Sequence, residues 1–337
     1  MDDIMDDFTR ELSIAISSVR TAARICQTVQ RQITPEALEK KDQSPVTIAD
    51  FASQAAVCKA LAEVFPNDPI VGEEDSAELR ASDQSEFLAR VQQELAAVGI
   101  EGNADAVCSW IDLGNGSAAD RFWTLDPIDG TKGFLRGQQY AISLALIVNG
   151  QISVAALGCP NLPLDNSNSE EEGPGSLLFA VRGEGAFVTS IEGHTFSPDD
   201  ATAIRVSPAS TWPEARLCES VESGHSSHSR SAQIAESLGI VKPPVRLDSQ
   251  AKYAVVARGE ADVYLRLPTR KDYREKIWDH AGGVLVVQEA GGIVTDVTGK
   301  PLDFTHGAEL AVNHGVAVSN GLLHAQVIDA LRDAGVE

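Results

Sequence analysis

Two aspartates separated by two residues follow a largely apolar stretch in the segment Asp126-Pro127-Ile128-Asp129-Gly130-Thr131. The stretch 122–125 predicts a strand that ends where this segment begins, which gives the following loop a rigid support. Pro127 fixes its own φ and Gly130 permits a sharp turn, so both carboxylates and the Ile128 carbonyl can face one centre. Mg²⁺ prefers such oxygen ligands. By itself, however, the segment is more typical of a turn.

Three further acidic positions also lie at the edge of an apolar element: Asp50 in the first turn of a helix expected over 47–65, Glu73 after the apolar stretch 69–72, and Asp279 before a helix expected from 281. Each has a simpler explanation when taken alone. Asp50 would favour the dipole of its helix by about 0.3–1 kcal/mol, Glu73 would belong to a solvated loop, and Asp279 would cap a helix. Their conjunction with Asp126 and Asp129 instead predicts one multi-metal site that hydrolyses a phosphate ester.

The charge balance limits the partners of this chain. It carries 49 Asp and Glu against 27 Lys and Arg, a formal net charge of -22 at pH 7. Duplex nucleic acid and anionic membranes require basic surfaces, so we expect neither as a partner. An anionic small substrate must then be met by metal ions and a local basic pocket.

Other features favour a globular protein of the cytoplasm. The 337 residues and 43% apolar content are sufficient for two cores. The five cysteines show neither Cys-x-x-Cys spacing nor an even count, so we expect reduced thiols rather than disulfides or zinc. The acidic first residues and the lack of a long apolar run argue against a targeting peptide or a membrane span.

Apolar spacing predicts a mixture of helices and strands. Helices are expected over 8–31, 47–65, 84–98, 228–238, 250–257, 280–289 and 324–334. Strands are expected over 176–181, 185–189, 215–218 and 261–267, a hairpin turn at Asn149-Gly150, and a loop over 99–119. Prolines between 194 and 213 predict a linker. We therefore expect a metal-binding α+β domain over residues 1–200 and an α/β domain over 201–337.

Longer motifs connect these acidic positions to a known family. They are KDQSPVTIAD (41–50), WTLDPIDGTKGFLRG (123–137), LGCPNLP (157–163), DSQAKY (248–253), YLRLP (264–268) and EKIWDH (275–280). With them the chain resembles, over nearly its whole length, the 3'(2'),5'-bisphosphate nucleotidases of the lithium-sensitive, inositol monophosphatase-like superfamily. Asp-x-x-Asp-Gly-Thr is typical of the superfamily, whereas DSQAKY, YLRLP and EKIWDH are specific to the nucleotidase branch.

The resemblance implies an α/β fold, a layered α/β/α/β/α sandwich with the site between the domains. It also implies two or three Mg²⁺ ions, with Li⁺ and Na⁺ as inhibitors. The ligands of the first ion are Glu73, Asp126 and the Ile128 carbonyl, and those of the second are Asp126, Asp129 and Asp279. A third ion would lie near Asp50 and Glu73.

The resemblance further assigns a catalytic base and a nucleotide pocket. Asp50 and Thr131 orient and deprotonate the metal-activated water that attacks phosphorus directly. The residues that contact the bisphosphorylated nucleotide are Thr131, His225, Ser249, Lys252, Arg266 and Asp279. Arg266 also lies in the apolar-rich run 263–267, where its charge requires a paired anion. That anion would be a substrate phosphate or, alternatively, a carboxylate of the chain. The local sequence does not decide between His225 and His228.

Three functions compete. The leading one is removal of the 3'-phosphate from adenosine 3',5'-bisphosphate to give AMP, with 3'-phosphoadenylyl sulfate and 2',5' isomers as further substrates. An inositol phosphate phosphatase would use the same metals with another pocket. An acidic Ca²⁺-binding protein would need the carboxylates only as charge, and it leaves Thr131 and Trp278 unexplained. We expect a monomer.

Two segments depart from the family pattern. Residues 281–283 read Ala-Gly-Gly where the superfamily commonly has Ala-Ala-Gly. The extra glycine predicts a helix start that is less stable by about 1 kcal/mol than with alanine. Residues 166–175 are acidic and rich in Ser and Gly, which predicts an inserted surface loop. Neither departure removes a proposed ligand.

Overall fold

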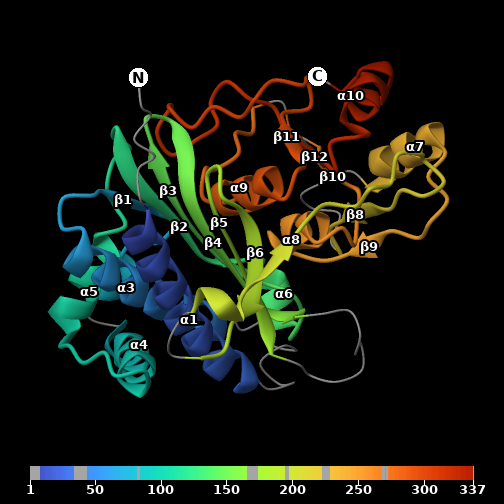
Figure 1. The fold of residues 1–337 in the computed structure, drawn as a ribbon. Coiled ribbons are helices and arrows are strands. Elements are labelled where there is room, and N and C mark those ends of the chain that lie inside the picture. Colours follow the sequence, from blue (N-terminus) through green and yellow to red (C-terminus); the bar gives the residue numbers. More distant parts are fainter. Residues whose placement is uncertain are drawn as a thin grey trace.

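The computed structural model describes residues 8–33, 44–81, 84–164, 174–193, 197–221, 228–267, 270 and 272–336. Within these ranges helices and strands alternate in five layers (Figure 1). The predicted α/β sandwich of the α/β/α/β/α type is thereby confirmed. The greater part of the predicted insertion at 166–175, and residues 194–196 of the predicted linker, lie outside the described residues.

Helices of the first layer cover one face of the larger sheet. They are α1 (Thr9–Arg31), α3 (Ser44–Val64), α4 (Ser85–Ala97) and α5 (Ala104–Asp112). α1 packs on α3 and on the larger sheet with an apolar stripe that includes Ile16 and Val19. The prediction of a loop over 99–119 is wrong, because α5 lies within it. Asn103 caps this helix by accepting a hydrogen bond from the Ala106 N–H at 2.9 Å, a signal that the sequence did contain.

The larger sheet has seven strands among the described residues. In spatial order they are β1 (Ile70–Gly72), β2 (Arg121–Asp129), β3 (Ala141–Val148), β4 (Gln151–Pro163), β5 (Gly175–Val181), β6 (Gly185–Ser190) and β7 (Thr202–Ile204). β1 pairs with β2 in parallel, and the other neighbours are antiparallel. The predicted hairpin is confirmed between β3 and β4, where Asn149 and Gly150 have φ values of 50° and 77°. β7 lies inside the predicted linker, so that prediction was partly wrong.

β2 continues further than expected. We predicted a strand that ends before Asp126, but β2 pairs with β3 as far as Asp129. The register shifts between Asp126 and Asp129, which marks a bulge. Pro127 has no N–H to donate to a ladder, and a bulge is one of the few places in a sheet that accept proline. Because bulges redirect side chains, this irregularity helps to aim both aspartates.

Two helices fill the space between the sheets, α8 (Ala251–Ala257) and α9 (Ala281–Glu289) (Figure 1). α9 contacts β3 to β6, and α8 contacts β8, β10 and β12 of the smaller sheet. That sheet has the order β11 (Ile293–Thr295), β12 (Val316–Ser319), β10 (Val263–Arg266), β8 (Leu217–Glu219) and β9 (Val245–Arg246). Helices α7 (His228–Leu238) and α10 (His324–Asp333) pack on its outer side.

The remaining helical turns are short. They are η1 (Glu78–Arg80), α6 (Thr131–Leu135) and η3 (Pro198–Asp200). All five cysteines are free, as expected, and the structure places them in the interior. In the part of the chain that the structure describes, no helix combines the length and the apolar character needed to cross a bilayer.

Candidate active site

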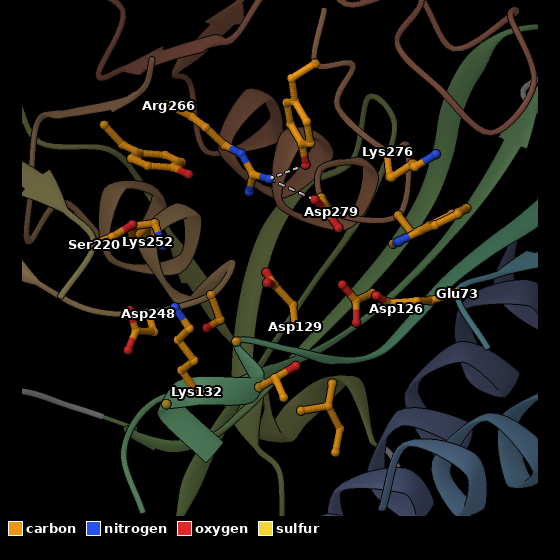
Figure 2. Close-up of a pocket in the computed structure, with 18 residues that line it drawn as sticks. Glu73, Asp126, Asp129, Lys132, Ser220, Asp248, Lys252, Arg266, Lys276 and Asp279 are labelled. Atoms are coloured by element: carbon orange, nitrogen blue, oxygen red, sulfur yellow. Dashed lines mark hydrogen bonds and ion pairs between the residues drawn. The ribbon is translucent and has the colours of Figure 1, made fainter. Parts of the chain in front are cut away.

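A cavity of about 570 Å³ lies between the end of β2, α6 and the segment that leads into α9 (Figure 2). Nine of the predicted site residues line it: Glu73, Asp126, Ile128, Asp129, Thr131, Ser249, Lys252, Arg266 and Asp279. Asp50 does not line the cavity, and His225 lies outside the described residues. The structure therefore brings together residues that are up to 206 positions apart in the chain, from Glu73 to Asp279.

Four carboxylates point toward a common region of this cavity (Figure 2). Glu73 follows β1, Asp126 and Asp129 flank the bulge of β2, and Asp279 lies just before α9. β1 and β2 are paired in parallel, with Gly72 opposite Leu125, so Glu73 and Asp126 leave the sheet at the same end. The pairing of β1 with β2 thus explains why three of the four carboxylates, those of Glu73, Asp126 and Asp129, lie close together.

Burial and mutual repulsion raise the pKa values of these groups. Desolvation is the larger cause for the carboxyl of Asp126, whose pKa is raised well above its ordinary value, and repulsion from Glu73 and Asp129 adds to it. The pKa of Asp129 rises to about 6 for the same kinds of reason, although Lys252, Arg266 and the Gln250 N–H oppose the rise.

The carboxyl of Glu73 is exposed to the cavity, yet its pKa also rises, to about 8, through desolvation and repulsion from Asp279 and Glu74. Solvent in the cavity partly screens this carboxyl from its charged neighbours. Each of these shifts indicates that negative charge is undercompensated in the cavity wall.

The residues fit a hard divalent cation. Asp126 Oδ1 is buried and has no hydrogen-bond partner within the described part of the chain. A buried carboxylate oxygen without a partner is costly, and a cation at that position would remove the cost. Carboxylate oxygens and a backbone carbonyl are also the donors that Mg²⁺ prefers.

A second group of potential ligand atoms is already occupied by other contacts. Glu275, Asp279 and His280 offer donors that lie within 4.8 Å of one another. Arg266 pairs with both carboxylates, through Nε to Glu275 Oε2 at 2.8 Å and through Nη2 to Asp279 Oδ2 at 2.9 Å. The buried His280 ring contacts Tyr253 OH at 2.7 Å and Glu275 Oε2 at 3.2 Å. We therefore assign Glu275, His280 and the Oδ2 atom of Asp279 to the support of Arg266.

The sequence left open whether the anion paired with Arg266 is a substrate phosphate or a carboxylate of the chain. The charge of Arg266 is paired with carboxylates of the chain, so the need for a compensating anion is met without substrate. Burial would lower the pKa of the guanidinium, but Glu275 and Asp279 outweigh this effect and raise it. The charge of Arg266 still faces the cavity, and the pair uses Asp279 Oδ2, with no hydrogen bond to Asp279 Oδ1 among the described residues.

Ser249 and Lys252 also line the cavity. Lys252 is labelled in Figure 2. Lys252 is 5% exposed, and its ammonium lies 5.3 Å from the centre of the Tyr264 ring. Ser249 has a φ of 68°, a left-handed conformation that costs energy in a residue other than glycine. A Cβ at Gly130 would lie 2.8 Å from Ser249 Cβ, so glycine permits the close approach of α6 to this strained residue.

Two explanations based on helix ends are not supported. α3 begins at Ser44, so Asp50 is beyond its first turn, where the dipole effect acts. Asp50 is instead buried, with 7% of its surface exposed, and burial together with Glu74 and Glu73 raises its pKa well above the ordinary value. Asp279 is not the cap of α9, because the N-cap position is His280 and Asp279 pairs with Arg266. The position of neither aspartate is therefore explained by a helix end.

The chain is similar to known proteins over nearly its whole length. The model of the inositol monophosphatase family matches residues 7–335. The chain belongs to the inositol monophosphatase family. Among curated relatives, 3'(2'),5'-bisphosphate nucleotidases of Schizosaccharomyces pombe and Oryza sativa are 46% and 43% identical to it, over 96% and 97% of this chain and 95% of each relative. That of Emericella nidulans is 41% identical over 96% of this chain and 98% of the relative. The resemblance inferred from the motifs is confirmed.

Solved structures of the inositol monophosphatase family share the fold. An IMPase of Thermotoga maritima matches with a TM-score of 0.61 and 21% identity, covering 95% of this chain and 96% of that one. CysQ of Bacteroides thetaiotaomicron matches with a TM-score of 0.60 and 20% identity, covering 93% and 98%. At this identity the likeness concerns the architecture alone.

The structure also adds residues that sequence reasoning did not assign. Ser220, Tyr264, Tyr273 and Lys276 line the cavity of this inositol monophosphatase family member, and Glu275 holds Arg266. Glu275 had one usable signal, since it stands within the EKIWDH motif only nine residues after Arg266. Ser220 had no such signal in the sequence, because its position in the cavity wall depends on how β8 lies beside β10.

Proposed function

We propose that this chain removes the 3'-phosphate of adenosine 3',5'-bisphosphate to give AMP and phosphate, and that it also accepts the sulfated analogue and 2',5' isomers. The observation that carries the proposal is one cavity lined by both acidic and basic side chains. Its acidic wall presents the carboxylates of Glu73, Asp126, Asp129 and Asp279. Lys252 and Arg266 also line the cavity, and Arg266 already pairs with Asp279 at 2.9 Å. A substrate with two phosphates fits such a cavity, because one phosphate can be bound through cations and the other directly by basic side chains. Relatives matched over 95% of their length are named 3'(2'),5'-bisphosphate nucleotidases, which supports a bisphosphorylated nucleotide as the substrate.

Magnesium is the cofactor that we propose for the acidic wall. Glu73, Asp126 and the Ile128 carbonyl would hold one ion, and Asp126, Asp129 and Asp279 a second. Asp50 and Glu73 would contribute to a third. When bound, Mg²⁺ neutralises phosphate charge and makes water more acidic.

The protein residues then position and deprotonate the attacking water. Thr131 begins α6 and is exposed to the cavity, whereas Asp50 is buried behind its wall. We propose that the Thr131 hydroxyl orients the water and that Asp50 serves as the group that ultimately takes the proton. No direct hydrogen bond joins these two described side chains, and we propose that a water molecule connects them.

The nucleotide is held by the remaining residues. Ser249 and Lys252 would bind the 5'-phosphate, with Arg266 beside it, and Thr131 and Asp279 would contact the phosphate that is removed. His225 belongs to the same proposal on the strength of the motif alignment alone. Lys252 has a preformed position, since it is buried and held against Tyr264, which reduces the entropy lost on binding.

A panel of phosphate esters tests the substrate. The chain is incubated with Mg²⁺ and adenosine 3',5'-bisphosphate, its 2',5' isomer, inositol 1-phosphate or an inositol polyphosphate, and phosphate release is followed. We expect the highest kcat/KM with a bisphosphorylated nucleotide. A higher value with an inositol phosphate would replace the proposal with an inositol phosphate phosphatase. Tight Ca²⁺ binding without any phosphate release would favour the acidic Ca²⁺-binding protein.

Several properties accompany this proposal. We expect Li⁺ and Na⁺ to inhibit by competing with a divalent ion, which added Mg²⁺ would relieve. We also expect a monomer in the cytoplasm and a division into domains over 1–200 and 201–337.

A further inference from the structure

Gln250 lies between the two sheets and is almost completely buried, with 1% of its surface exposed. Its backbone N–H donates to Asp129 Oδ2 at 2.6 Å, and its side-chain Nε2 donates to the Trp278 carbonyl at 2.9 Å. Its Oε1 accepts from Ser143 Oγ and from the Gly283 N–H, both at 3.1 Å. One residue thus contacts four separate positions, of which Asp129 and Trp278 line the cavity.

These four contacts connect strands β2 and β3 to the segment that leads into α9. Ser143 lies in β3 and Asp129 at the end of β2, whereas Trp278 immediately precedes Asp279 and Gly283 lies in the first turn of α9. Gln250 therefore holds one of the proposed metal ligands directly and the other through the adjacent backbone. Among the described hydrogen bonds, those of Gln250 are the ones that join the β2 aspartates to the backbone beside Asp279.

Gly282 makes this arrangement possible. A Cβ at position 282 would lie 2.5 Å from Ser143 Oγ. Glycine leaves room for the hydroxyl, which then reaches Gln250 Oε1. The glycine that departs from the family pattern is therefore linked to the hydrogen bonds of Gln250, and it does more than weaken a helix start.

We propose that Gln250 is a positioning residue that fixes the placement of Asp129 relative to Asp279 and thereby sets the affinity of the site for divalent cations. The inference rests on the proposed function, because the same carboxylates are involved. A buried amide with satisfied hydrogen bonds has one preferred orientation, so the groups bonded to it are held as well. Residues that orient metal ligands from behind typically contribute about 10- to 100-fold to metal affinity or activity.

The test replaces Gln250 with methionine in the full chain. Gln250→Met keeps the length of the side chain but can neither donate to the Trp278 carbonyl nor accept from Gly283. Mn²⁺ is used as the probe, and its binding is measured from the electron paramagnetic resonance signal of the free ion. We expect Mn²⁺ affinity to fall by about 10- to 100-fold. We also expect kcat to fall while the KM for adenosine 3',5'-bisphosphate changes less.

Asn313 provides a matched control. It is a buried amide with 3% exposure that donates to Asp296 Oδ2 and to the Pro301 carbonyl and accepts from the Asp303 N–H. It does not line the cavity. Asn313→Leu should lower the melting temperature in the way Gln250→Met does, but leave Mn²⁺ affinity and kcat unchanged.

A second variant covers the case in which Gln250→Met does not fold. Gln250→Asn keeps an amide that is one methylene too short to reach both Trp278 and Gly283, so Mn²⁺ affinity should fall less than with methionine but in the same direction. Wild-type affinity and kcat in a folded Gln250 variant would overturn the positioning role while leaving the proposed function intact. A wild-type chain that binds no Mn²⁺ and hydrolyses no phosphate ester would overturn both.

Discussion

Asp129 belongs to the motif Asp126 to Thr131, and the structure shows which groups surround its carboxylate. Its carboxylate faces the cavity, accepts the Gln250 N–H at 2.6 Å and is repelled by Asp279. Asp129→Asn keeps the shape of the side chain and an acceptor for Gln250 but removes the charge. Because a bound metal contributes several kcal/mol to catalysis, we expect kcat to fall by at least about 100-fold.

The melting temperature of metal-free Asp129→Asn should not fall, since the substitution removes repulsion within the acidic wall. Phosphate release with Mg²⁺ and thermal unfolding with EDTA measure the two effects. An unfolded variant, or one with wild-type kcat, would contradict the role of Asp129.

A substitution of Lys252 should change substrate binding without changing the rate of turnover. The Lys252 ammonium is buried beside the Tyr264 ring and lines the cavity. Lys252→Ala removes a charged hydrogen bond to a phosphate that does not react, so we expect KM to rise by about 10- to 100-fold with little change in kcat. Steady-state kinetics with adenosine 3',5'-bisphosphate measures both constants.

Lys59 is a suitable control for Lys252, because it pairs with Glu63 on the surface of α3 and does not line the cavity. Lys59→Ala should change neither constant. A fall in kcat alone for Lys252→Ala would instead place this lysine in the chemical step.

At the scale of single elements, the start of α9 shows how packing overrides helix propensity. Propensity alone predicts that alanine stabilises a helix by about 1 kcal/mol relative to glycine. A Cβ at Gly283, however, would lie 2.4 Å from the Tyr253 ring of α8. We expect Gly283→Ala to destabilise the protein by about 1–3 kcal/mol, the usual cost of overpacking, as measured by urea unfolding.

Gly282→Ala is the matched comparison within the same helix. Its Cβ would meet the Ser143 hydroxyl, which can rotate away, and not a ring that is fixed by its neighbours. The loss of stability should therefore be smaller than for Gly283→Ala. Equal stability of Gly283→Ala and the wild type would show that α8 and α9 can separate without cost.

For the whole molecule, the acidic wall predicts how stability depends on pH without metal. Folding raises the pKa of Asp129 from 3.8 to about 6 and that of Glu73 from 4.5 to about 8. The folded state then binds more protons than the unfolded state between these values, so its stability is present at low pH and is lost as pH rises through the folded pKa. With EDTA, the melting temperature should fall between pH 5 and pH 8.5, a range that brackets both raised pKa values.

Magnesium should reverse this trend, because the deprotonated carboxylates bind it best. Added Mg²⁺ is expected to raise the melting temperature more at pH 8.5 than at pH 5. Glu73→Gln serves as the control, since it removes one of the titrating groups and should flatten the decline. A decline of unchanged slope in that variant would assign the effect to the overall net charge of -22.

A continuous core joins the two parts of the molecule. One cluster of buried apolar residues includes Ala145 and Ala155 of the larger sheet together with Leu285 of α9 and Tyr264 of the smaller sheet. It lies directly beside the cavity that both parts line. The domain boundary near residue 200 stays a prediction, and this shared core suggests that the two parts need each other to hold the site together.

The sequence predicted the elements whose signals are local. The hairpin at Asn149-Gly150 and the amphipathic helix α1 follow from turn chemistry and apolar spacing. Apolar spacing does not reveal the helix within 99–119, because α5 has only nine residues, a length at which such spacing is a weak signal. The bulge in β2 could not be predicted, because it depends on the register against β3.

By itself the sequence determined the family, the layered fold and the identity of the residues that carry the chemistry, because motifs such as Asp126 to Thr131 keep those residues together in the chain. Only the tertiary structure decided the partners of each charge. Glu275 and not a substrate phosphate anchors Arg266, and Gln250 connects Asp129 to the backbone beside Asp279. The contact of Asp129 with Gln250 joins positions distant in the chain, and the distances in both contacts are set by the packing of sheets and helices rather than by local propensity.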